Sequence, residues 1–290
     1  MRPLDPRGAL VALLLAALWG GNPVAIKIGL LDAPPIRLAW MRFLLGGAVI
    51  VLWGWATGRF VSFRIEPDDW RPLLTLGALF TVQVGLMHVG TNLTTASHAA
   101  ILLNSQAIHT VVLAHFLVPG DRLAPRRAIG ILIAYSGAII LFARHWAAGS
   151  NTLVGDAIVA VSAFLLAERQ IFLARAVQRL DPLKLLLAQA VLGTLAFVTI
   201  STVFEARVPM RWTASLGLAV LYQGGVIAGF NFIGNLWLLQ QYRPSAVATC
   251  FLTTPLFGVL IASAVMGDPL TPELLLAALL VAVGIGLTIR

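Results

Sequence analysis

Charged residues are scarce in this 290-residue chain: Asp, Glu, Lys and Arg make up 11% of it, whereas hydrophobic residues make up 59%. A soluble globular domain usually has about a quarter charged residues. The mean hydropathy is +0.90. Too few polar side chains are present to cover a water-soluble surface, so the composition predicts an integral membrane protein.

Cysteine and lysine are also rare. The single cysteine, Cys250, excludes an intramolecular disulfide and a cysteine-based metal site. Neither lysine, Lys27 or Lys184, follows a phosphate-binding glycine loop, and no H-E-x-x-H or G-x-S-x-G motif occurs. His98 and His109 have no acidic companion in their own segment, which makes an intramembrane enzyme the least favoured reading. We expect no metal, no cofactor and no ATP hydrolysis.

Apolar runs separated by proline, glycine or charged residues divide the chain into ten candidate helices. A helix needs about 20 apolar residues to cross the hydrocarbon core, so ten crossings leave only short connections. The first run is too long for a cleaved signal peptide, and we expect it to be retained. The fold class expected is an all-α polytopic membrane protein whose spans are 8–31, 36–57, 71–91, 96–118, 127–143, 153–175, 183–204, 214–240, 244–266 and 273–289.

Basic residues divide unequally between the two ends of these spans. With the N-terminus placed inside, thirteen Lys and Arg residues fall on the inner side, four fall on the outer side and three lie within spans. The positive-inside rule therefore predicts cytoplasmic termini, and we expect a bacterial inner-membrane protein. The net charge of +8 is then an orientation signal, and no nucleic acid partner is expected.

A short turn occurs twice, once from Gly120 to Pro125 (Gly-Asp-Arg-Leu-Ala-Pro) and again 147 positions later from Gly267 to Pro272 (Gly-Asp-Pro-Leu-Thr-Pro). Each half of the chain holds five candidate spans, an odd number, so the second half must enter the membrane from the opposite side. We expect two inverted five-helix repeats with a boundary between residues 147 and 148. Secondary transporters use this architecture to open alternately to each side of the membrane around a central site.

Several of these features together resemble the drug/metabolite transporter superfamily, specifically its EamA-type ten-helix exporters. They are the Trp19-Gly20-Gly21-Asn22-Pro23 segment with Lys27, the Pro34 to Arg42 entry of the second span, and both Gly-Asp-x-Leu-x-Pro turns. The resemblance covers nearly the whole chain. It implies alternating access and the export of small metabolites, with amino acids, including aromatic ones, as the first expectation. Sugar-phosphate and nucleotide-sugar exchangers of the same superfamily remain the alternative.

The chain departs from the family pattern at two kinds of position. Asp121 and Asp268 stand in the turns where relatives more often have Glu. Pro255 of the ninth span is matched in the fourth span by Ile108, where many relatives also have proline. The resemblance therefore does not predict the local backbone of the fourth span.

Polar and aromatic side chains deep in the spans are the candidate substrate-binding residues. Pro23 has no N–H to donate to the carbonyl of Trp19 and predicts irregular backbone, which is tolerated at membrane depth where a cavity or protein groups satisfy it. In the eighth span, Gly225 and Gly229 form a small-xxx-small pair that favours close helix packing. Interhelical hydrogen bonding is the alternative role of each polar candidate. We expect a cavity lined by spans 1, 3, 4, 6, 8 and 9, with Trp19, Asn22, Gln83, His88, Asn104, Ser105, His109, Gln170, Asn231, Asn235 and Thr253 as its binding residues.

Ionisable residues within spans are costly and are candidates for a coupling or gating role. Glu168 is either a proton-coupling carboxylate or the ion-pair partner of a residue such as Arg175. Lys27 and Arg42 are placed near the outer ends of their spans, where they are read as anchors or gate residues. Because these two and Arg169 are expected at opposite ends, the cavity suits a zwitterion or neutral metabolite better than a phosphate. Proton antiport, exchange and facilitated diffusion all remain open.

Overall fold

A computed structural model describes residues 5–58, 60, 64–117, 125–147, 152–176, 179–241, 250–251 and 253–289. Within these ranges the chain is helical and contains no strand. The prediction of an all-α protein is confirmed.

The helices fall into two series, one from each half of the chain. The first series is α1 (Pro6–Gly20), α2 (Asn22–Gly29), α3 (Pro35–Ala56), η2 (Pro67–Asp69), α4 (Trp70–Asn92), α5 (Ala96–Asn104), α6 (Gln106–Leu117) and α7 (Pro125–Ala147). The second series is α8 (Leu153–Ala176), α9 (Pro182–Phe204), α10 (Ala214–Val220), η3 (Leu221–Asn231), α11 (Phe232–Gln241), α13 (Thr254–Met266) and α14 (Pro272–Ile289).

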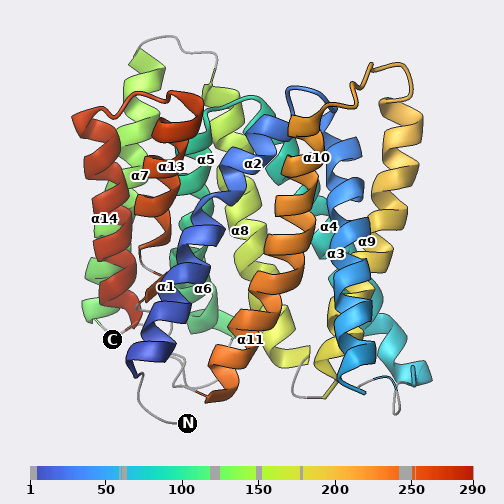
Figure 1. Ribbon diagram of the computed structural model, residues 1–290. Helices are drawn as coiled ribbons and strands as arrows, with labels where there is room; N and C mark the ends of the chain where they lie inside the picture. The colour runs from blue at the N-terminus through green and yellow to red at the C-terminus, as the bar shows by residue number, and fades with distance from the viewer. Residues whose placement is uncertain are drawn as a thin grey trace.

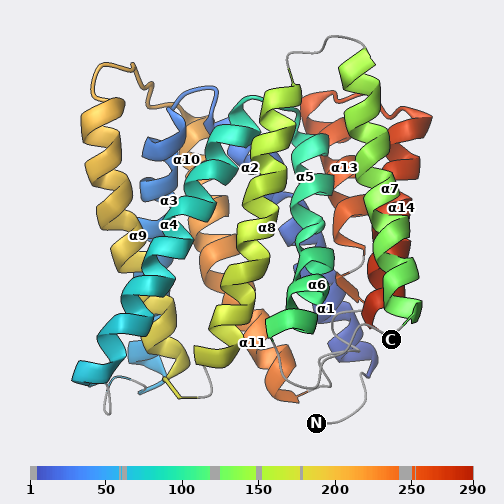
Figure 2. The same ribbon diagram turned by 180° about the vertical axis from the view of Figure 1, so that it is seen from behind.

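The helices run up and down through a single bundle (Figure 1). Three passages are interrupted, namely α1–α2, α5–α6 and α10–η3–α11; with each counted once, the described elements make ten passages. The start of α1 and the end of α14 lie on the same side of the bundle, whereas α8 starts on the opposite side (Figures 1 and 2). The two halves therefore run through the bundle with inverted orientation, as the odd number of spans per half predicts.

Five helical stretches of the described chain are long and apolar enough to cross a membrane: Pro6–Gly29, Pro35–Ala56, Pro67–Asn92, Pro182–Phe204 and Ala214–Gly234. Shorter apolar helices cover Ala128–Gly137, Thr254–Met266 and Pro272–Gly284. α8, which contains Asp156, Glu168, Arg169 and Arg175, is not among these stretches.

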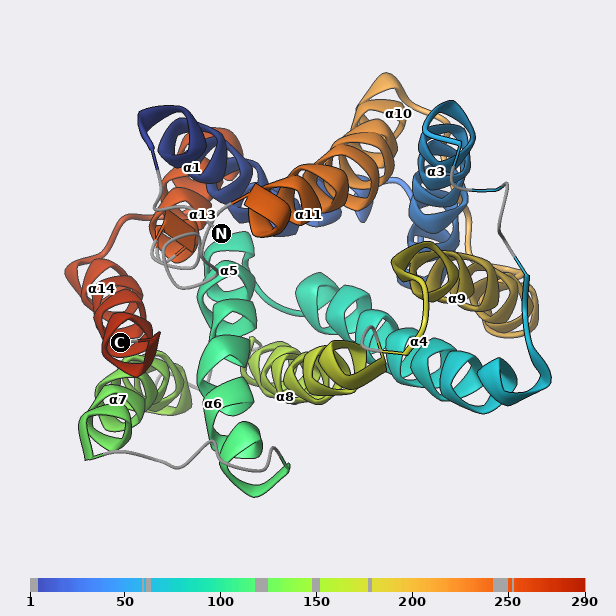
Figure 3. The same cartoon turned by 90° about the horizontal axis from the view of Figure 1, so that it is seen from below.

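The main contacts between the two halves come in matched pairs: a contact of a helix in the first half with one in the second has a counterpart between the two equivalent helices. α7 packs against α14 at one end of the bundle, and α3 packs against α9 at the other (Figure 3). The contact of α3 with η3 has its counterpart in the contact of α9 with α4, and the contact of α1 with α13 has its counterpart in that of α8 with α6. The space between α3, α4, α9 and η3 therefore receives side chains from both halves.

The predicted irregularity of the first span is present at Gly21, where α1 ends and α2 begins. A Cβ atom at Gly20 would lie 2.8 Å from the carbonyl oxygen of Thr254 and 2.9 Å from the backbone nitrogen of Gly258. Only glycine allows α1 and α13 to approach so closely. The fourth span is interrupted as well, at Ser105 between α5 and α6.

The glycine pair of the eighth span is not the one that the sequence predicts. Residues Leu221–Asn231 form a π-helix, so one turn takes more residues than in an α-helix. A Cβ atom at Gly224 would lie 2.7 Å from the carbonyl oxygen of Arg42, and one at Gly229 would lie 2.5 Å from Cγ1 of Val49. Gly224 and Gly229 therefore face α3, whereas the nearest atom to a Cβ at Gly225 belongs to Leu221 of the same helix.

Candidate functional site

Side chains of η3 hold the interrupted first span by its backbone carbonyls. The sequence predicts that Pro23 leaves the carbonyl of Trp19 open to a partner, but the η3 side chains bind three other carbonyls of this span. Each donor is a side-chain amide or phenol, so buried backbone acceptors are satisfied without water. The bonds run from Asn231 Nδ2 to Leu15 O (2.8 Å), from Tyr222 Oη to Leu18 O (2.7 Å) and from Gln223 Nε2 to Ala25 O (3.1 Å).

Trp19 and Asn22 lie on either side of this interruption. Trp19 is half-buried, and its ring meets that of Phe232 edge to face at a centroid distance of 5.6 Å. Asn22 is buried, and its Oδ1 atom has no hydrogen-bond partner among the described residues. An unpartnered buried acceptor favours a bound water or ligand group beside it.

Gln83 and His88 lie on α4, but they have different partners. Gln83 Nε2 donates to Ser162 Oγ of α8 at 3.0 Å, and the Ser162 hydroxyl donates to the backbone carbonyl of Gln83 at 2.8 Å. Gln83 therefore joins α4 to α8, the interhelical role given as the alternative. His88 is fully buried and its Nδ1 lies 2.9 Å from the carbonyl of Val84, while its Nε2 has no partner within the described ranges.

Arg42 does not reach a membrane surface. Its side chain is 4% exposed, that of Arg169 is 7% exposed, and the two guanidiniums interact electrostatically. Neither forms an ion pair with any described residue. The expectation that Arg42 and Arg169 lie at opposite ends is therefore wrong, because both side chains turn into the bundle and come close enough to interact.

The two arginines sit on a pair of phenylalanines. The guanidinium carbon of Arg42 lies 4.9 Å from the ring centroid of Phe43, and that of Arg169 lies 5.0 Å from the centroid of Phe80. Phe43 and Phe80 meet edge to face with centroids 4.6 Å apart. Cation–π contacts of this kind stabilise a desolvated guanidinium.

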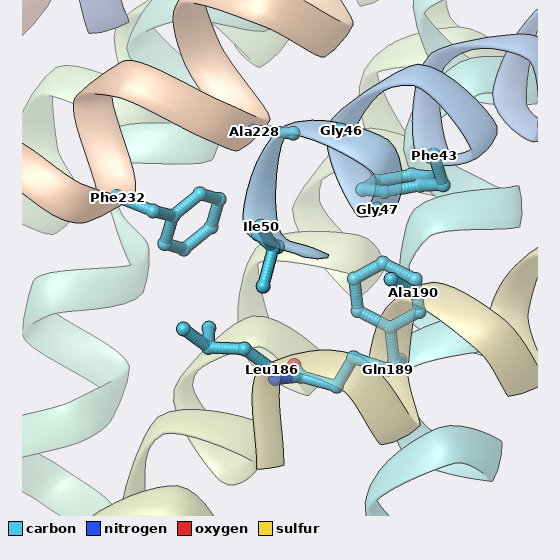
Figure 4. Close-up of a pocket in the computed structure, with 10 residues that line it drawn as sticks. Phe43, Gly46, Gly47, Ile50, Leu186, Gln189, Ala190, Ala228 and Phe232 are labelled. Atoms are coloured by element: carbon cyan, nitrogen blue, oxygen red, sulfur yellow. The ribbon is translucent and has the colours of Figure 1, made fainter. Parts of the chain in front are cut away.

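A small, mainly apolar pocket adjoins these rings between α3, α4, α9 and the η3–α11 segment (Figure 4). Phe43, Gly46, Ile50 and Phe80 line it from the first half of the chain. The second half contributes Leu186, Gln189, Ala190, Ala228 and Phe232. The predicted cavity included the third and eighth spans, which line this pocket, but it omitted the second and seventh spans, α3 and α9, which line it as well.

The candidates of the fourth and ninth spans mostly bond to their own helices. Asn104 donates to the carbonyl of Ala100 at 2.7 Å, Ser105 to that of Leu102 at 2.6 Å, and Thr253 to that of Cys250 at 2.6 Å. These bonds satisfy the side chains at the interruption of α5–α6 and at the start of α13. His109 packs between the rings of Tyr135 and Phe164 at centroid distances of 5.6 and 5.7 Å.

Two further candidates are not brought to the pocket, and the side chain of a third lies outside the described residues. Gln170 is exposed on α8. Glu168 is half-buried and forms no ion pair with Arg175 or with any other described residue. Asn235 belongs to α11, but its side chain lies outside the described part of the structure.

Lys27 caps the end of a neighbouring helix. Its ammonium donates to the carbonyls of Thr91, Asn92 and Thr94 at 3.2, 3.0 and 2.5 Å. These carbonyls belong to the C-terminal end of α4 and the turn after it, where a positive charge also interacts favourably with the helix dipole. Lys27 therefore links α2 to the C-terminal end of α4 through hydrogen bonds.

A buried polar cluster that the sequence did not single out lies where α8 and α5 begin. Asp156 is 1% exposed; it accepts a hydrogen bond from the Thr94 hydroxyl and lies 3.1 Å from Nδ1 of His98. Asp156 is the fourth residue of α8, and a lone carboxylate near a helix end does not by itself indicate a partner in another span. Within the described ranges, no group of three or more His, Cys, Asp or Glu side chains is arranged to hold a metal ion.

Comparison with known proteins identifies the same two-part organisation. The family description of EamA-like transporters matches residues 6–143 and again residues 153–290. A probable amino-acid metabolite efflux pump of Escherichia coli is 26% identical, with 97% of this chain and 94% of that protein covered. An uncharacterized transporter of Bacillus subtilis is 21% identical over 92% of this chain and 91% of its own length. One solved crystal structure shares the fold at a TM-score of 0.71 and 21% identity, and the match covers 97% of this chain and 96% of that one.

Proposed function

Because the chain belongs to the EamA-like transporter family, we propose that it is a secondary transporter that exports small metabolites, with amino acids, including aromatic ones, as the first substrate class. Transport itself is the activity of the family. The proposal adds the cargo, the direction and the mechanism. The Escherichia coli relative is named a probable amino-acid metabolite efflux pump, which supports the cargo proposed here.

The observation that carries the proposal is the pocket between the two halves. Phe43 and Phe80 come from the first half, whereas Gln189 and Phe232 come from the second. A ligand that touches all four side chains contacts both halves at once. Its binding free energy can then favour one relative orientation of the halves over another, which is what alternating access requires.

Hydrogen bonds and an ion pair join the two halves on the side where α3 begins, and they support a bundle that is closed at this end. The carboxylate of Glu205 accepts hydrogen bonds from the backbone N–H groups of Ile36 and Arg37. Asp32 accepts a hydrogen bond from Thr213 and forms an ion pair with Arg211 at 3.0 Å. These polar contacts must separate if the pocket opens toward that side, so we propose that this end acts as a gate.

The proposed orientation places both termini in the cytoplasm of a bacterial cell and the gate at the outer face of its inner membrane. The excess of basic residues at the terminus-bearing side supports this orientation. Aromatic cargo is supported by the rings of Trp19 and Phe232, which meet at 5.6 Å, because aromatic side chains bind planar apolar groups through their faces and edges. Phe232 also lines the pocket.

Uptake into liposomes tests the proposal. Purified full-length protein would be reconstituted and presented with radiolabelled amino acids, a nucleoside and a sugar phosphate, with and without an imposed pH gradient. Saturable uptake that is accelerated by unlabelled cargo inside the vesicles is expected of a carrier. Absence of saturable uptake for every compound, from protein that unfolds cooperatively on heating, would reject the proposed substrate class.

A further inference from the structure

Two arginines, one from each half of the chain, are buried close together in the bundle without an acidic partner among the described residues. Arg42 belongs to α3 and Arg169 to α8. Both are more than nine-tenths buried, and Nε and NH1 of Arg42 have no hydrogen-bond partner among the described residues. No salt bridge of the described chain includes either residue.

Two uncompensated positive charges in a membrane protein are energetically costly. A buried charge is normally paired with a counter-ion, and charges inside spans usually mark a substrate or ion pathway. The rings of Phe43 and Phe80 compensate part of the cost, since each contacts one guanidinium. They carry no negative charge, however, and the mutual repulsion of Arg42 and Arg169 remains.

Neighbouring polar groups add to the unsatisfied site. The charge of Arg42 acts on His88, and Gln223 lies next to that histidine. Nε2 of His88 and Oε1 of Gln223 are buried and by distance have no hydrogen-bond partner within the described ranges, although the two side chains interact with each other. Buried polar groups therefore lie beside Arg42.

The packing of the fold does not itself require a charge at these positions. Arg42 is the eighth residue of α3, and the eighth residue of its counterpart α9 is Gln189. Arg169 is the seventeenth residue of α8, and Asn22 is the seventeenth residue of the α1–α2 passage counted from Pro6. An uncharged amide occupies the equivalent position of the other half in both cases. A functional role therefore accounts for the two charges better than packing does.

We propose that Arg42 and Arg169 together bind an oxyanion group of the cargo, a carboxylate or a phosphate, and that organic anions are therefore preferred to zwitterions, neutral compounds and cations. The guanidinium fork matches the geometry of such groups. Because one arginine comes from each half, a bound anion removes their repulsion and favours the arrangement in which the halves approach each other. The inference rests on the proposed transport function; within metabolite export it moves the preferred cargo from zwitterionic amino acids to organic anions, such as acidic or N-acylated amino acids.

A graded set of probes tests the preference in liposomes. N-acetylphenylalanine is an anion, phenylalanine a zwitterion and phenylalaninamide a cation, so the series changes charge on one aromatic frame; glutamate with glutamine repeats the comparison on an aliphatic frame. A sugar phosphate distinguishes phosphate from carboxylate. We expect the anionic members, or the sugar phosphate, to have a KM at least about tenfold below that of their uncharged or cationic counterparts, the effect of about one charge-assisted hydrogen bond.

Substitutions assign the preference to the two residues. Arg42→Gln and Arg169→Gln are each expected to raise the KM for the anionic cargo by about 10- to 100-fold, and the lysine variants are expected to raise it less. Arg175→Gln, which removes an exposed arginine from the same helix as Arg169, is the matched control and should leave KM unchanged. Equal KM values along the charge series, or unchanged anion KM in both glutamine variants, would overturn the inference while leaving the transporter in place.

A binding measurement covers the case in which no compound is transported. That result would reject the proposed cargo classes, and the anion site would then be tested on detergent-solubilised protein. A ligand that binds only the folded state raises the unfolding temperature of the protein. We expect N-acetylphenylalanine or inorganic phosphate to raise it for the unmodified protein and the Arg175→Gln variant, and not for Arg42→Gln or Arg169→Gln. No rise in the unmodified protein, or the same rise in all four proteins, would refute the anion site.

Discussion

The ammonium nitrogen of Lys27 lies 2.5 Å from the carbonyl oxygen of Thr94, in the turn that follows α4. The same nitrogen also donates to Thr91 and Asn92. One flexible side chain of α2 thus satisfies two carbonyls of the last turn of α4 and one of the turn that follows it. These contacts give Lys27 a structural role in the bundle, and the side chain does not line the pocket.

Replacement of Lys27 by methionine is expected to lower the free energy of unfolding by about 1.5–3 kcal/mol, the usual contribution of hydrogen bonds to a charged group. Methionine keeps the apolar stem and removes the donors. Thermal unfolding in detergent measures the change, and Arg175→Gln serves as the comparison because it removes an exposed charge. A KM that rises tenfold with unaltered stability would instead make Lys27 a substrate ligand.

Glu205→Gln is expected to weaken the attachment of α9 to the first turn of α3. The carboxylate accepts hydrogen bonds from Ile36 and Arg37 at 2.8 Å each, and a negative charge at a helix N-terminus stabilises the helix by about 0.3–2 kcal/mol. The unfolding temperature should fall. Asp68→Asn, which neutralises an exposed carboxylate, should leave it unchanged, and an equal fall in both variants would exclude a specific cap at Glu205.

Stability should fall in acid through Asp32. A hydrogen bond from Thr213, with smaller contributions from Ser215 and Arg211, lowers the pKa of Asp32 below its ordinary value. A carboxyl group whose pKa is lower in the folded protein stabilises the fold above its unfolded pKa of about 4, and this stabilisation is lost as the pH falls through the lower folded pKa. Unfolding temperatures of the unmodified protein and Asp32→Asn should therefore differ at about pH 7 and converge below about pH 4. A difference that does not change with pH would contradict the prediction.

Trp19→Ala should raise the KM for an aromatic cargo by about 2- to 10-fold, since aromatic contacts contribute about 0.5–1.5 kcal/mol. The indole is half-buried beside Phe232, a ring that lines the pocket. Trp19→Phe retains an aromatic ring and should restore most of the affinity. Initial rates of uptake give the KM values, and an identical KM in the alanine variant would remove Trp19 from the binding site.

Glu168→Gln should abolish any stimulation of transport by a pH gradient. The carboxylate is half-buried in α8 and has no ion-pair partner among the described residues, and an ionisable residue within a span is a candidate for a proton pathway. Asp156→Asn is the comparison variant: it neutralises another acidic residue of α8, one that already accepts a hydrogen bond from Thr94, and it should leave the dependence on the pH gradient in place. Gradient dependence that persists in the Glu168 variant would exclude this residue from proton coupling.

The sequence identified polar side chains deep in the spans but not their partners. Gln83, Asn104 and Ser105 were expected to line a substrate cavity, with interhelical hydrogen bonding as the alternative; Gln83 bonds to α8, whereas Asn104 and Ser105 bond to carbonyls of their own segment. Whether that bond goes to the same helix, a neighbouring helix or a ligand depends on how each helix is rotated. α8 is apolar on all sides apart from its few charged residues, so its periodicity does not indicate which face lies inside.

Composition and length alone determined that this chain crosses a membrane as helices, because apolar side chains and a hydrogen-bonded backbone are the conditions for stability in hydrocarbon. The odd number of spans in each repeat likewise determined the inversion of the halves. Only the tertiary structure decided that Arg42 and Arg169, 127 positions apart in the chain, act on each other in the centre. Close contacts such as that of Gly224 with the Arg42 carbonyl set the depth and rotation of α3, and these depend on the shapes of the packed surfaces, which no pattern along a single helix specifies.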